Sequence, residues 1–465
     1  MMNYKTINEN KFLKSALTEE NPFITTSKVM EWLKYRNEAI NVEVTKIPFK
    51  KLNHWFLDKT NGMLKHSSGK FFTIEGINVK TNWGAVKEWE QPIINQPEIG
   101  YLGIITKEIN GILYFLLQAK VEPGNVNNVQ LSPTLQATKS NYTQVHQGNK
   151  PRYLEYFQNA TRDEIILDQL QSEQGARFLK KRNRNIIIKI DGDIDVHEDF
   201  IWLTLGQIKK LIQKDNLVNM DTRTVISGIS FEHSITVKEK LDNFELGMLL
   251  SANNKTNSKH TYDDVIKWIT DLKCRYELTI ESRSIFNIKK WEVTPFDIRH
   301  NEDKYFRVIA AQVEISNREV KTWSQPLIEP LQEGIIAFIV KKINGIYHFL
   351  VQAKLESGNF DIIEMAPTVQ CITGSYDSDN SLPFLDDVLN AKEDQIRFNT
   401  LQSEEGGRFF REQNRSMIIE ADDSFPTIIP ENYIWLTLNQ LNYFLKFNNY
   451  LNIQARSLIS AIKFI

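Results

Sequence analysis

Apolar positions along the chain follow a helical spacing and then a strand pattern, and this order occurs twice. Near residues 29–33 and again near 265–269, apolar side chains recur three or four positions apart, which places them on one helix face. Runs rich in apolar, β-branched and aromatic residues follow at 70–79 and 304–315 and predict strands. The pattern therefore predicts a fold that mixes helices and strands.

Short turn and cap signals refine these elements. Asn-Gly pairs at 110–111 and 344–345 lie between apolar runs, and both residues accept the positive φ of a type I′ hairpin turn. A Thr-x-x-Gln pattern at 204–207 and at 437–440 is a capping box, which predicts that a helix begins there. Each signal occurs once in each half of the chain.

The two halves are copies of one unit. The segment QAKVEPGN at 118–125 returns as QAKLESGN at 352–359, an offset of 352 − 118 = 234 residues. LQSEQGARF at 170–178 returns as LQSEEGGRF at 401–409. Self-similarity of this length indicates a duplicated structural unit.

The repeat predicts an α+β fold made by tandem duplication, with modules at residues 20–230 and 255–465. The polar stretch SANNKTNSKH, which begins at Ser251, is the predicted linker. Two such modules can stack as separate units or exchange elements, and the residue pattern leaves both arrangements open.

Composition narrows the class of protein. The 465 residues are 41% apolar and 25% charged, which is typical of a globular chain with about two domains. A net charge of −2 argues against a general binder of nucleic acid or membrane surfaces. The two cysteines, Cys274 and Cys371, build no disulfide framework, and no signal peptide or membrane-spanning run is evident. A cytoplasmic protein is expected.

Polar residues that recur in both copies are the first candidates for a site. Gln118, Lys120 and Glu122 alternate along a predicted strand and so share one face, as do their counterparts at 352–356. A polar face at the end of an apolar strand suits a cleft. The alternative is a solvated outer face, or a Lys–Glu pair that protects a sheet edge.

A second recurring group contains Glu173 and Arg177, repeated as Glu404 and Arg408. Small residues such as those at 175–176 precede each arginine and would let the backbone approach a ligand closely. The guanidinium fork suits a diphosphate, because it donates two parallel hydrogen bonds. The alternative is a structural Glu–Arg ion pair that holds a turn.

Two further features are candidates. Trp55 and Trp291 align within two residues, and each either stacks on a nucleotide base or anchors a core. The copies diverge after the SPTLQ and APTVQ segments, where the first copy is richer in donors, acceptors and titratable groups. If the two sites differ, the first is the expected catalyst, although a polar loop that drifted is the alternative. The divergent residues of interest are Thr138, Lys139, Ser140, Asn141, Tyr142 and His146 in the first copy and Ser375 and Tyr376 in the second.

Several other chemistries lack their signatures. No G-x-G-x-x-G follows a strand, and no Walker loop, H-E-x-x-H or G-x-S-x-G is present. Eight histidines and two cysteines show no metal-ligand spacing. Neither a nicotinamide cofactor nor a metal is therefore expected.

The run QAKVEPGNVNNVQLSPTLQATKSNY and the motif LQSEQGARF resemble the hallmarks of the NDP-hexose 2,3-dehydratase family, and the duplicated layout and length match too. The resemblance implies a homodimer whose modules are Nudix-like, without the Nudix catalytic helix. It implies a hydro-lyase that acts on dTDP-4-keto-6-deoxy-D-glucose without a cofactor. The product, a 3,4-diketo-2,6-dideoxy sugar nucleotide, would pass to an NADPH-dependent 3-ketoreductase.

The resemblance also implies roles for residues. Elimination next to a ketone needs a base at carbon 3, stabilisation of the enolate and an acid at the leaving hydroxyl. For the base, Glu173, His146 and Tyr142 are considered; Tyr142 better suits an acid or oxyanion donor, and Lys120 or Arg177 would hold phosphate or enolate. Substrate contacts are expected at Trp55, Thr138, Lys139, Ser140, Asn141, Tyr142, Arg177, Trp291, Lys354, Gln370, Ser375, Tyr376, Glu404 and Arg408.

Three other functions are weighed against this one. A non-catalytic dTDP-sugar binding protein would bind dTDP without turnover. A 3,5-epimerase or isomerase would exchange protons without losing water. A structural protein with a duplicated scaffold would bind no nucleotide.

Overall fold

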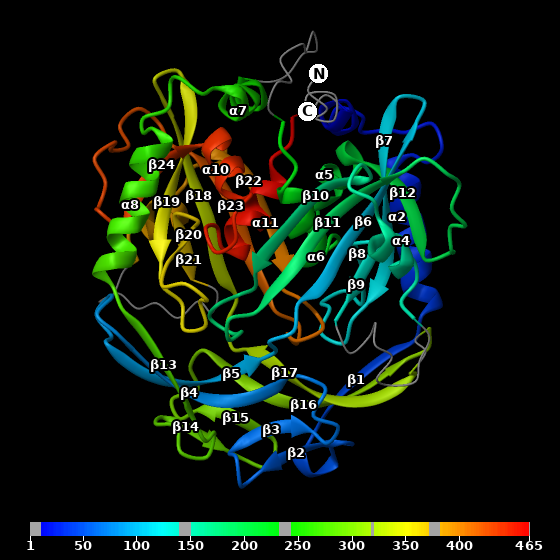
Figure 1. Cartoon of the computed structure of the whole chain (residues 1–465), viewed down its shortest axis with the longest axis vertical. Helices are drawn as coiled ribbons and strands as arrows, with labels where there is room; N and C mark the ends of the chain where they lie inside the picture. The colour runs from blue at the N-terminus through cyan, green and yellow to red at the C-terminus, as the bar shows by residue number, and fades with distance from the viewer. Residues whose placement is uncertain (1–10, 139–149, 232–242, 318–319, 372–381, 465) are drawn as a thin grey trace.

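The computed structural model describes residues 11–138, 150–231, 243–317, 320–371 and 382–464. Two lobes of mixed helix and strand stand side by side above a pair of curved sheets (Figure 1). Each lobe comes from one half of the chain, so the architecture is a mixed α and β fold with two similar halves.

The first lobe is a seven-stranded sheet in the order β10-β11-β6-β7-β12, with β8 paired to β7 and β9 to β6. β11 runs parallel to β6, and the other pairs are antiparallel. Its strands are β6 (Gly100–Ile109), β7 (Ile112–Val121), β8 (Val129–Ser132), β9 (Leu135–Ala137), β10 (Ile165–Ser172), β11 (Arg182–Ile190) and β12 (Phe200–Thr204). Its helices are α2 (Thr26–Ala39), α4 (Leu154–Asn159), α5 (Leu205–Ile212) and α6 (Met220–Ser227).

The second lobe repeats this arrangement, with the order β20-β19-β18-β23-β22 and with β24 and β21 paired to β19 and β18. Its strands are β18 (Gly334–Ile343), β19 (Ile346–Lys354), β20 (Glu364–Ala366), β21 (Val369–Cys371), β22 (Ile396–Ser403), β23 (Gln413–Glu420) and β24 (Tyr433–Thr437). Its helices are α7 (Asn243–Asn253), α8 (Tyr262–Arg275), α9 (Leu385–Leu389), α10 (Leu438–Phe444), α11 (Ile453–Ala461) and the 3₁₀ turn η2 (Glu393–Gln395).

The lower sheets show that the two halves exchange strands. β1 of the first half pairs antiparallel with β16 of the second, from Val42 opposite Ile315, and β13 of the second half pairs with β4 of the first, from Leu278 opposite Thr81. Of the two arrangements left open by the sequence, exchange is therefore correct. The strands are β1 (Val42–Ile47), β2 (Trp55–Asp58), β3 (Met63–His66), β4 (Thr73–Thr81), β5 (Glu88–Asn95), β13 (Leu278–Arg283), β14 (Trp291–Val293), β15 (Asp297–His300), β16 (Phe306–Ile315) and β17 (Thr322–Pro330), with a 3₁₀ turn, η1 (Phe49–Lys51).

Each upper sheet splits at a threonine. β6 and β7 pair near their connecting turn and then diverge, so that β8 and β9 fill the gap between them. Thr134 lies at the fork, where its hydroxyl accepts from the Ile105 N–H at 2.9 Å and donates to the Leu116 carbonyl. Thr368 repeats this role in the second lobe, with the Ile339 N–H at 2.9 Å. The fork opens the end of each sheet to polar side chains.

Most local predictions are confirmed. Both Asn-Gly pairs have positive φ, 51° and 74° at 110–111 and 54° and 81° at 344–345. Both capping boxes form, and both amphipathic helices bury their apolar stripes. The predicted linker is wrong at its start, because Ser251 lies inside α7 and is fully buried. The Ser251 hydroxyl donates to the Tyr347 carbonyl at 2.6 Å and so fixes α7 to the second lobe.

The halves meet along α6 and α11, in the centre of Figure 1. Arg223 of α6 reaches the second half, where its guanidinium donates to the Gln402 side chain at 2.5 Å and to the Ser403 carbonyl at 2.7 Å. Arg456 of α11 makes the reciprocal bonds to the Thr224 hydroxyl, at 2.8 Å, and to the Ser172 carbonyl. Each arginine therefore fixes the end of a strand in the opposite half.

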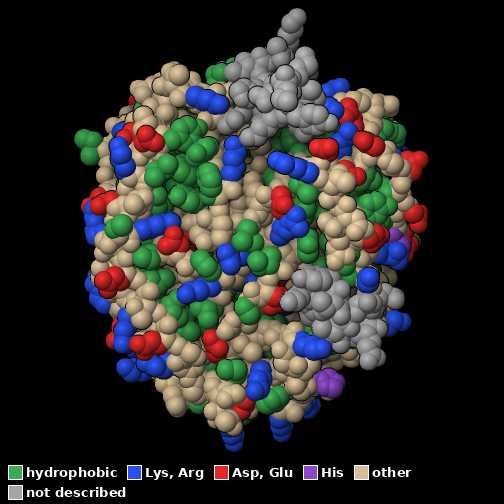
Figure 2. Space-filling view, in the orientation of Figure 1, with side chains coloured by type: hydrophobic (Ala, Val, Ile, Leu, Met, Phe, Trp, Pro, Cys, Tyr) green, Lys and Arg blue, Asp and Glu red, His purple; other side chains and the backbone are tan. Residues whose placement is uncertain are grey.

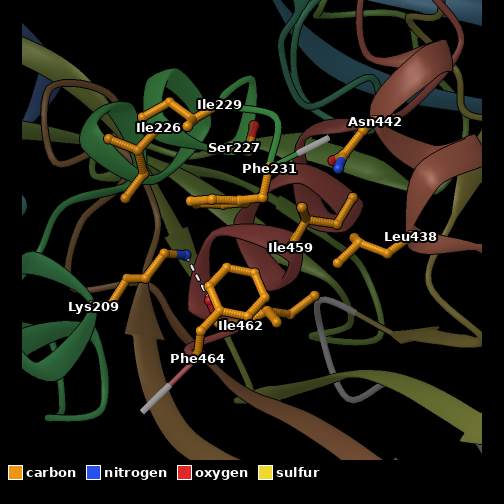
Figure 3. Close-up of a pocket in the computed structure, with 10 residues that line it drawn as sticks. All are labelled: Lys209, Ile226, Ser227, Ile229, Phe231, Leu438, Asn442, Ile459, Ile462 and Phe464. Atoms are coloured by element: carbon orange, nitrogen blue, oxygen red, sulfur yellow. Dashed lines mark hydrogen bonds between the residues drawn. The ribbon is translucent and has the colours of Figure 1, made fainter. Parts of the chain in front are cut away.

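A small cavity at the far ends of α6 and α11 surrounds Lys209 (Figure 3). The Lys209 ammonium donates to the carbonyls of Ser460, at 3.0 Å, and Ile462, at 2.6 Å, between the rings of Phe231 and Phe464. Burial lowers the pKa of Lys209 to about 7. Residues of both halves line this cavity, and its walls are mainly apolar. We therefore regard it as part of the interface between the halves and not as the candidate active site.

The face in Figure 2 shows no large area of a single charge sign. Acidic and basic side chains are interspersed over the face in Figure 2. Within the described ranges, no helix is long and apolar enough to span a membrane. Cys274 is exposed and Cys371 is buried, and both are free thiols.

Candidate active site

Two polar clusters lie at the forked ends of the upper sheets, and each is built from both halves of the chain. Their titratable members interact electrostatically within each cluster, as the pKa displacements below show. The first cluster comprises Lys120, Glu122, Gln136, Glu173, Lys181, Asp221, Glu405 and Arg408. The second comprises the counterparts Lys354, Glu356, Gln370, Glu404, Glu412, Gln454, Gln174 and Arg177.

Crossed loops explain why each cluster draws on both halves. The Gly124 N–H donates to the Gly406 carbonyl at 2.7 Å, and in the related contact the Gly358 N–H donates to the Gly175 carbonyl at 2.6 Å. A Cβ added at Gly124 would lie 1.6 Å from the Phe409 carbonyl oxygen, so only glycine fits there. The close approach predicted for these glycines is therefore to the opposite half of the chain.

The first cluster is organised around Glu122 at the end of β7. Glu122 Oε1 lies 3.4 Å from the Lys120 ammonium and accepts a hydrogen bond from the Gln136 side chain at 2.9 Å. Gln136 also accepts from the Ser132 hydroxyl at 2.9 Å. Glu122 Oε2 is buried without a hydrogen-bond partner among the described residues. This carboxylate therefore presents one free oxygen to the cluster.

Glu173 and Lys181 form the wall of the first cluster that comes from β10 and β11. The Asn183 side chain donates to Glu173 at 2.7 Å, and the Lys181 ammonium donates to the Glu98 carbonyl. Burial raises the pKa of Glu173 and lowers that of Lys181. The attraction between the two charges partly opposes both shifts. Both side chains are thus fixed in place.

Asp221 and Glu405 complete the first cluster. Asp221, in the first turn of α6, is 2% exposed, and Glu405 is partly buried in the crossed loop. No hydrogen bond or ion pair joins either carboxylate to another described residue. Burial, followed by repulsion from Glu405, Glu173 and Glu122, raises the pKa of Asp221 far above its usual range. Burial raises the pKa of Glu405 to about 7, although Arg408 opposes this shift.

The second cluster differs because its buried polar atoms lack partners. Gln174, Glu412 and Gln454 are at most 1% exposed, and neither side-chain polar atom of any of them has a hydrogen-bond partner among the described residues. Arg177 is 5% exposed, and its Nε and Nη2 are likewise unpartnered. Burial raises the pKa of Glu412 to about 7, and burial together with Glu412 raises that of Glu404 to about 8.

Each cluster borders an aromatic stack in the lower sheets. Arg408 lies 4.2 Å from the centre of the Phe72 ring, which packs on Trp55 with ring centres 4.8 Å apart. The second stack repeats this order. Arg177 lies 4.1 Å from the centre of the Phe306 ring, and the ring centres of Phe306 and Trp291 are 5.0 Å apart. Trp55 and Trp291 are 7% and 8% exposed, which fits the core-anchor interpretation of their repetition.

Comparison with known proteins identifies the family. The family model for NDP-hexose 2,3-dehydratase matches residues 26–229 and again 262–462. The chain belongs to the NDP-hexose 2,3-dehydratase family. It is 45% identical to a dTDP-4-dehydro-6-deoxy-alpha-D-glucopyranose 2,3-dehydratase of Saccharopolyspora spinosa, over 98% of this chain and 95% of the relative. The resemblance inferred from the motifs is thus confirmed.

Two further relatives in the family carry the same name. The protein of Amycolatopsis orientalis is 39% identical over 96% of this chain and 92% of its own length. That of Streptomyces violaceoruber is 40% identical over 93% of this chain and 96% of its own length. The similarity therefore spans both halves and both clusters of this dehydratase family member.

The predicted site residues divide among several places. Lys120, Glu173 and Arg408 lie in the first cluster, and Arg177 lies in the second, so the LQSEQGARF motif serves both. Thr138 directly follows β9 and Gln136, beside the first cluster. The second cluster also holds Lys354, Gln370 and Glu404. Lys139, Ser140, Asn141, Tyr142, His146, Ser375 and Tyr376 lie outside the described residues.

The alternatives for the recurring motifs are also resolved. Lys120 and Glu122 do pair, yet they line a buried cluster and not a solvated face. No ion pair within the described residues joins Glu173 to Arg177, so the turn is not held by that pair. No three His, Cys, Asp or Glu side chains of the described chain are grouped as metal ligands.

Sequence reasoning missed Asp221, Lys181 and Glu405. Each changes its chemistry between the copies: Asp221 is replaced by Gln454, Glu405 by Gln174, and Lys181 by the oppositely charged Glu412. A position-by-position comparison of the copies could have found them. The recurring candidates are residues that are identical in both copies, so these three positions, where the copies differ, were passed over.

Proposed function

We propose that the chain is a hydro-lyase that removes water across carbons 2 and 3 of dTDP-4-keto-6-deoxy-D-glucose. The product is a 3,4-diketo-2,6-dideoxy sugar nucleotide for deoxysugar biosynthesis. The first cluster supports this function best, because it gathers unpartnered carboxylates and a lysine near Thr138, where the donor-rich stretch of the sequence begins. Family membership and the names of the three relatives support the substrate class.

The reaction needs only groups of this kind. The ketone at carbon 4 acidifies the hydrogen on carbon 3, so a base can remove it and place charge on the carbonyl oxygen. A cation or hydrogen-bond donor beside that oxygen stabilises the enolate. A general acid then protonates the hydroxyl that leaves carbon 2. The enol product takes a proton at carbon 2 and becomes a ketone.

The role of Lys120 follows from its position in the first cluster, and the other roles are carried over from the sequence. Lys120 stabilises the enolate, since its ammonium lies at the fork beside Glu122. Tyr142 donates to the same oxygen or serves as acid, and Thr138 to Asn141 contact the substrate. Glu173 and His146 are the candidate bases predicted from the sequence. Glu173 accepts a hydrogen bond from the Asn183 side chain.

The second cluster binds nucleotide-sugar without turnover. Arg177, with two unpartnered nitrogens, offers a fork for diphosphate, and Lys354 and Gln370 lie beside it in the cluster. Ser375 and Tyr376 contribute from the adjoining segment. Trp55 and Trp291 stay nucleotide contacts predicted from the sequence, although both are buried in the aromatic stacks.

The remaining elements of the proposal concern assembly. The modules at 20–230 and 255–465 are each Nudix-like, with strands exchanged between them, and two chains form a homodimer. An NADPH-dependent 3-ketoreductase consumes the product, because a 3,4-diketone is reactive. No cofactor or metal takes part, and a cytoplasmic location stays a prediction.

Incubation with dTDP-4-keto-6-deoxy-D-glucose, followed by mass spectrometry, tests the function. We expect loss of the mass of one water, without added NADPH or metal and in the presence of a chelator. Calorimetry with dTDP accompanies it, because a binding protein would bind without turnover and a structural protein would not bind. An unchanged substrate mass, with dTDP bound, would replace the dehydratase by a binding protein or an isomerase.

A further inference from the structure

The two clusters occupy related places but differ in their capacity for proton transfer. Asp221 and Gln454 hold the same position in the first turns of α6 and α11. Glu405 and Gln174 hold the same position in the crossed loops. An amide keeps nearly the size and polarity of a carboxyl group, but it neither takes up nor releases a proton near neutral pH. At these two positions the second cluster carries amides in place of the carboxyl groups of the first, while Glu412 stands where the first cluster has Lys181.

The two carboxyl groups also have the geometry of reactive groups. Asp221 is 2% exposed and its carboxylate has no hydrogen bond or ion pair in the described chain; Glu405, which is partly buried, also lacks such a partner there. A Cβ at Gly407 would lie 2.3 Å from Glu405 Oε1 and 3.5 Å from Glu122 Oε1, so these carboxylates flank one glycine. Buried polar groups are normally bonded, so the unpartnered carboxyl of the buried Asp221 points to a ligand.

We propose that Glu405 is the catalytic base and Asp221 the catalytic acid of the dehydration, both acting in the first cluster. This assignment rests on the proposed function and deepens it. It takes the role of base from Glu173, whose Oε1 is engaged by Asn183 at 2.7 Å. The base then comes from the second half of the chain and the acid from the first.

The step balances with these two groups and no other reactant. Glu405 takes the proton from carbon 3, and the C–H electron pair forms the C3–C4 double bond of the enolate. The enolate collapses to restore the ketone, a C2–C3 double bond forms, and the C2–O bond breaks. Asp221 gives its proton to the leaving hydroxide, which departs as water. Tautomerisation of the 3-enol places a proton on carbon 2.

The surrounding charges favour this division of roles. Arg408, from the same loop as Glu405, stabilises the ionised form of that carboxyl group, which a base requires. Asp221 faces the carboxyl groups of Glu405, Glu173 and Glu122, with Lys120 as the opposing cation, so its proton is retained. Lys181 also faces Glu405 and Glu173.

Two isosteric variants test the pair in heavy water. Glu405→Gln should lower kcat by about 100-fold or more and abolish deuterium uptake at carbon 3 of recovered substrate, because no base remains. Asp221→Asn should lower kcat to a similar degree but still allow deuterium uptake at carbon 3, because only the departure of hydroxide is blocked. A purely structural role would not separate exchange from water loss.

Matched controls make the outcome decisive. Asp193→Asn makes the same chemical change at an exposed ion pair with Lys107 and should leave kcat unchanged. For Glu405→Gln and Asp221→Asn, KM and the affinity for dTDP should stay within about threefold of the wild type, since neither carboxyl group is assigned a role in binding. A wild-type protein that fails to release water would refute the function itself. An active wild type whose folded variants retain kcat would refute only this pair.

The wild-type pH profile tests the pair without substitutions, should either variant fail to fold. Glu405 must be ionised to act as base, and its pKa in the ligand-free protein is raised to about 7, so kcat/KM should rise through about pH 7. A kcat/KM that does not change between about pH 5 and about pH 9 would overturn the assignment.

Discussion

Glu412→Gln should stabilise the protein in alkaline solution. Glu412 is 1% exposed, and both of its carboxylate oxygens lack hydrogen-bond partners among the described residues. Burial raises its pKa from 4.5 to about 7, although Arg177 opposes the shift. The folded state therefore binds this proton more tightly than the unfolded state does. The contribution of Glu412 to stability is fully present below about pH 4.5 and is lost as pH rises through about pH 7.

The size of the pKa shift of Glu412 determines how much stability the variant gains. A pKa raised by about 2.5 corresponds to about 3 kcal/mol of folding free energy lost by about pH 8. Gln cannot ionise, so the variant avoids this loss. For a chain of 465 residues the unfolding entropy is about 1 kcal/mol per kelvin, so Tm should rise by about 3 °C at pH 8. At pH 5 the gain should be under about 1 °C.

Thermal unfolding of wild type, Glu412→Gln and Glu277→Gln at both pH values measures this effect. Glu277 is exposed, so its variant should match the wild type at each pH. Equal Tm values for wild type and Glu412→Gln at pH 8 would contradict a buried, unpartnered carboxylate in the second cluster. An equal gain at both pH values would assign the effect to packing and not to ionisation.

Two further variants separate structure from function. Trp55→Ala should cost about 3–5 kcal/mol of stability, because Trp55 packs on Phe72 in a closed core; an unchanged Tm with weakened dTDP binding would instead support base stacking. Tyr142→Phe should lower turnover far more than Tyr376→Phe, because the first copy holds the denser set of donors. Equal losses of turnover, with unaltered dTDP affinity, would refute the asymmetry of the two sites.

The repeat, its hairpins and its capped helices could be predicted from the sequence because each depends on local spacing. The Asn-Gly turn and the Thr-x-x-Gln cap specify backbone geometry within four residues. The exchange of β1 and β13 could not be predicted, since a repeat at a constant offset is equally compatible with stacked modules. The linker was misplaced because Ser251 is polar in sequence, although its hydroxyl satisfies backbone groups inside the core.

The candidate site was predicted in part for the same reason. Lys120 and Glu173 recur in both copies and do lie in the first cluster. The crossed loops, however, carry Arg177 to the second cluster and bring Arg408 and Glu405 to the first. Pairing across halves depends on the backbone contact between Gly124 and Gly406, which leaves no periodic signal in the sequence. Composite sites of this kind emerge only from the three-dimensional arrangement.

The most direct test of the dehydratase account follows isotopes at carbon 2. Substrate labelled with heavy oxygen on carbon 2 is turned over in heavy water, and the product is trapped by reduction before it decomposes. We predict that the product has lost the labelled oxygen and carries deuterium at carbon 2, because the enol takes a solvent proton there. A product that keeps the labelled oxygen and gains deuterium only at carbon 3 or 5 would contradict the account and identify an epimerase.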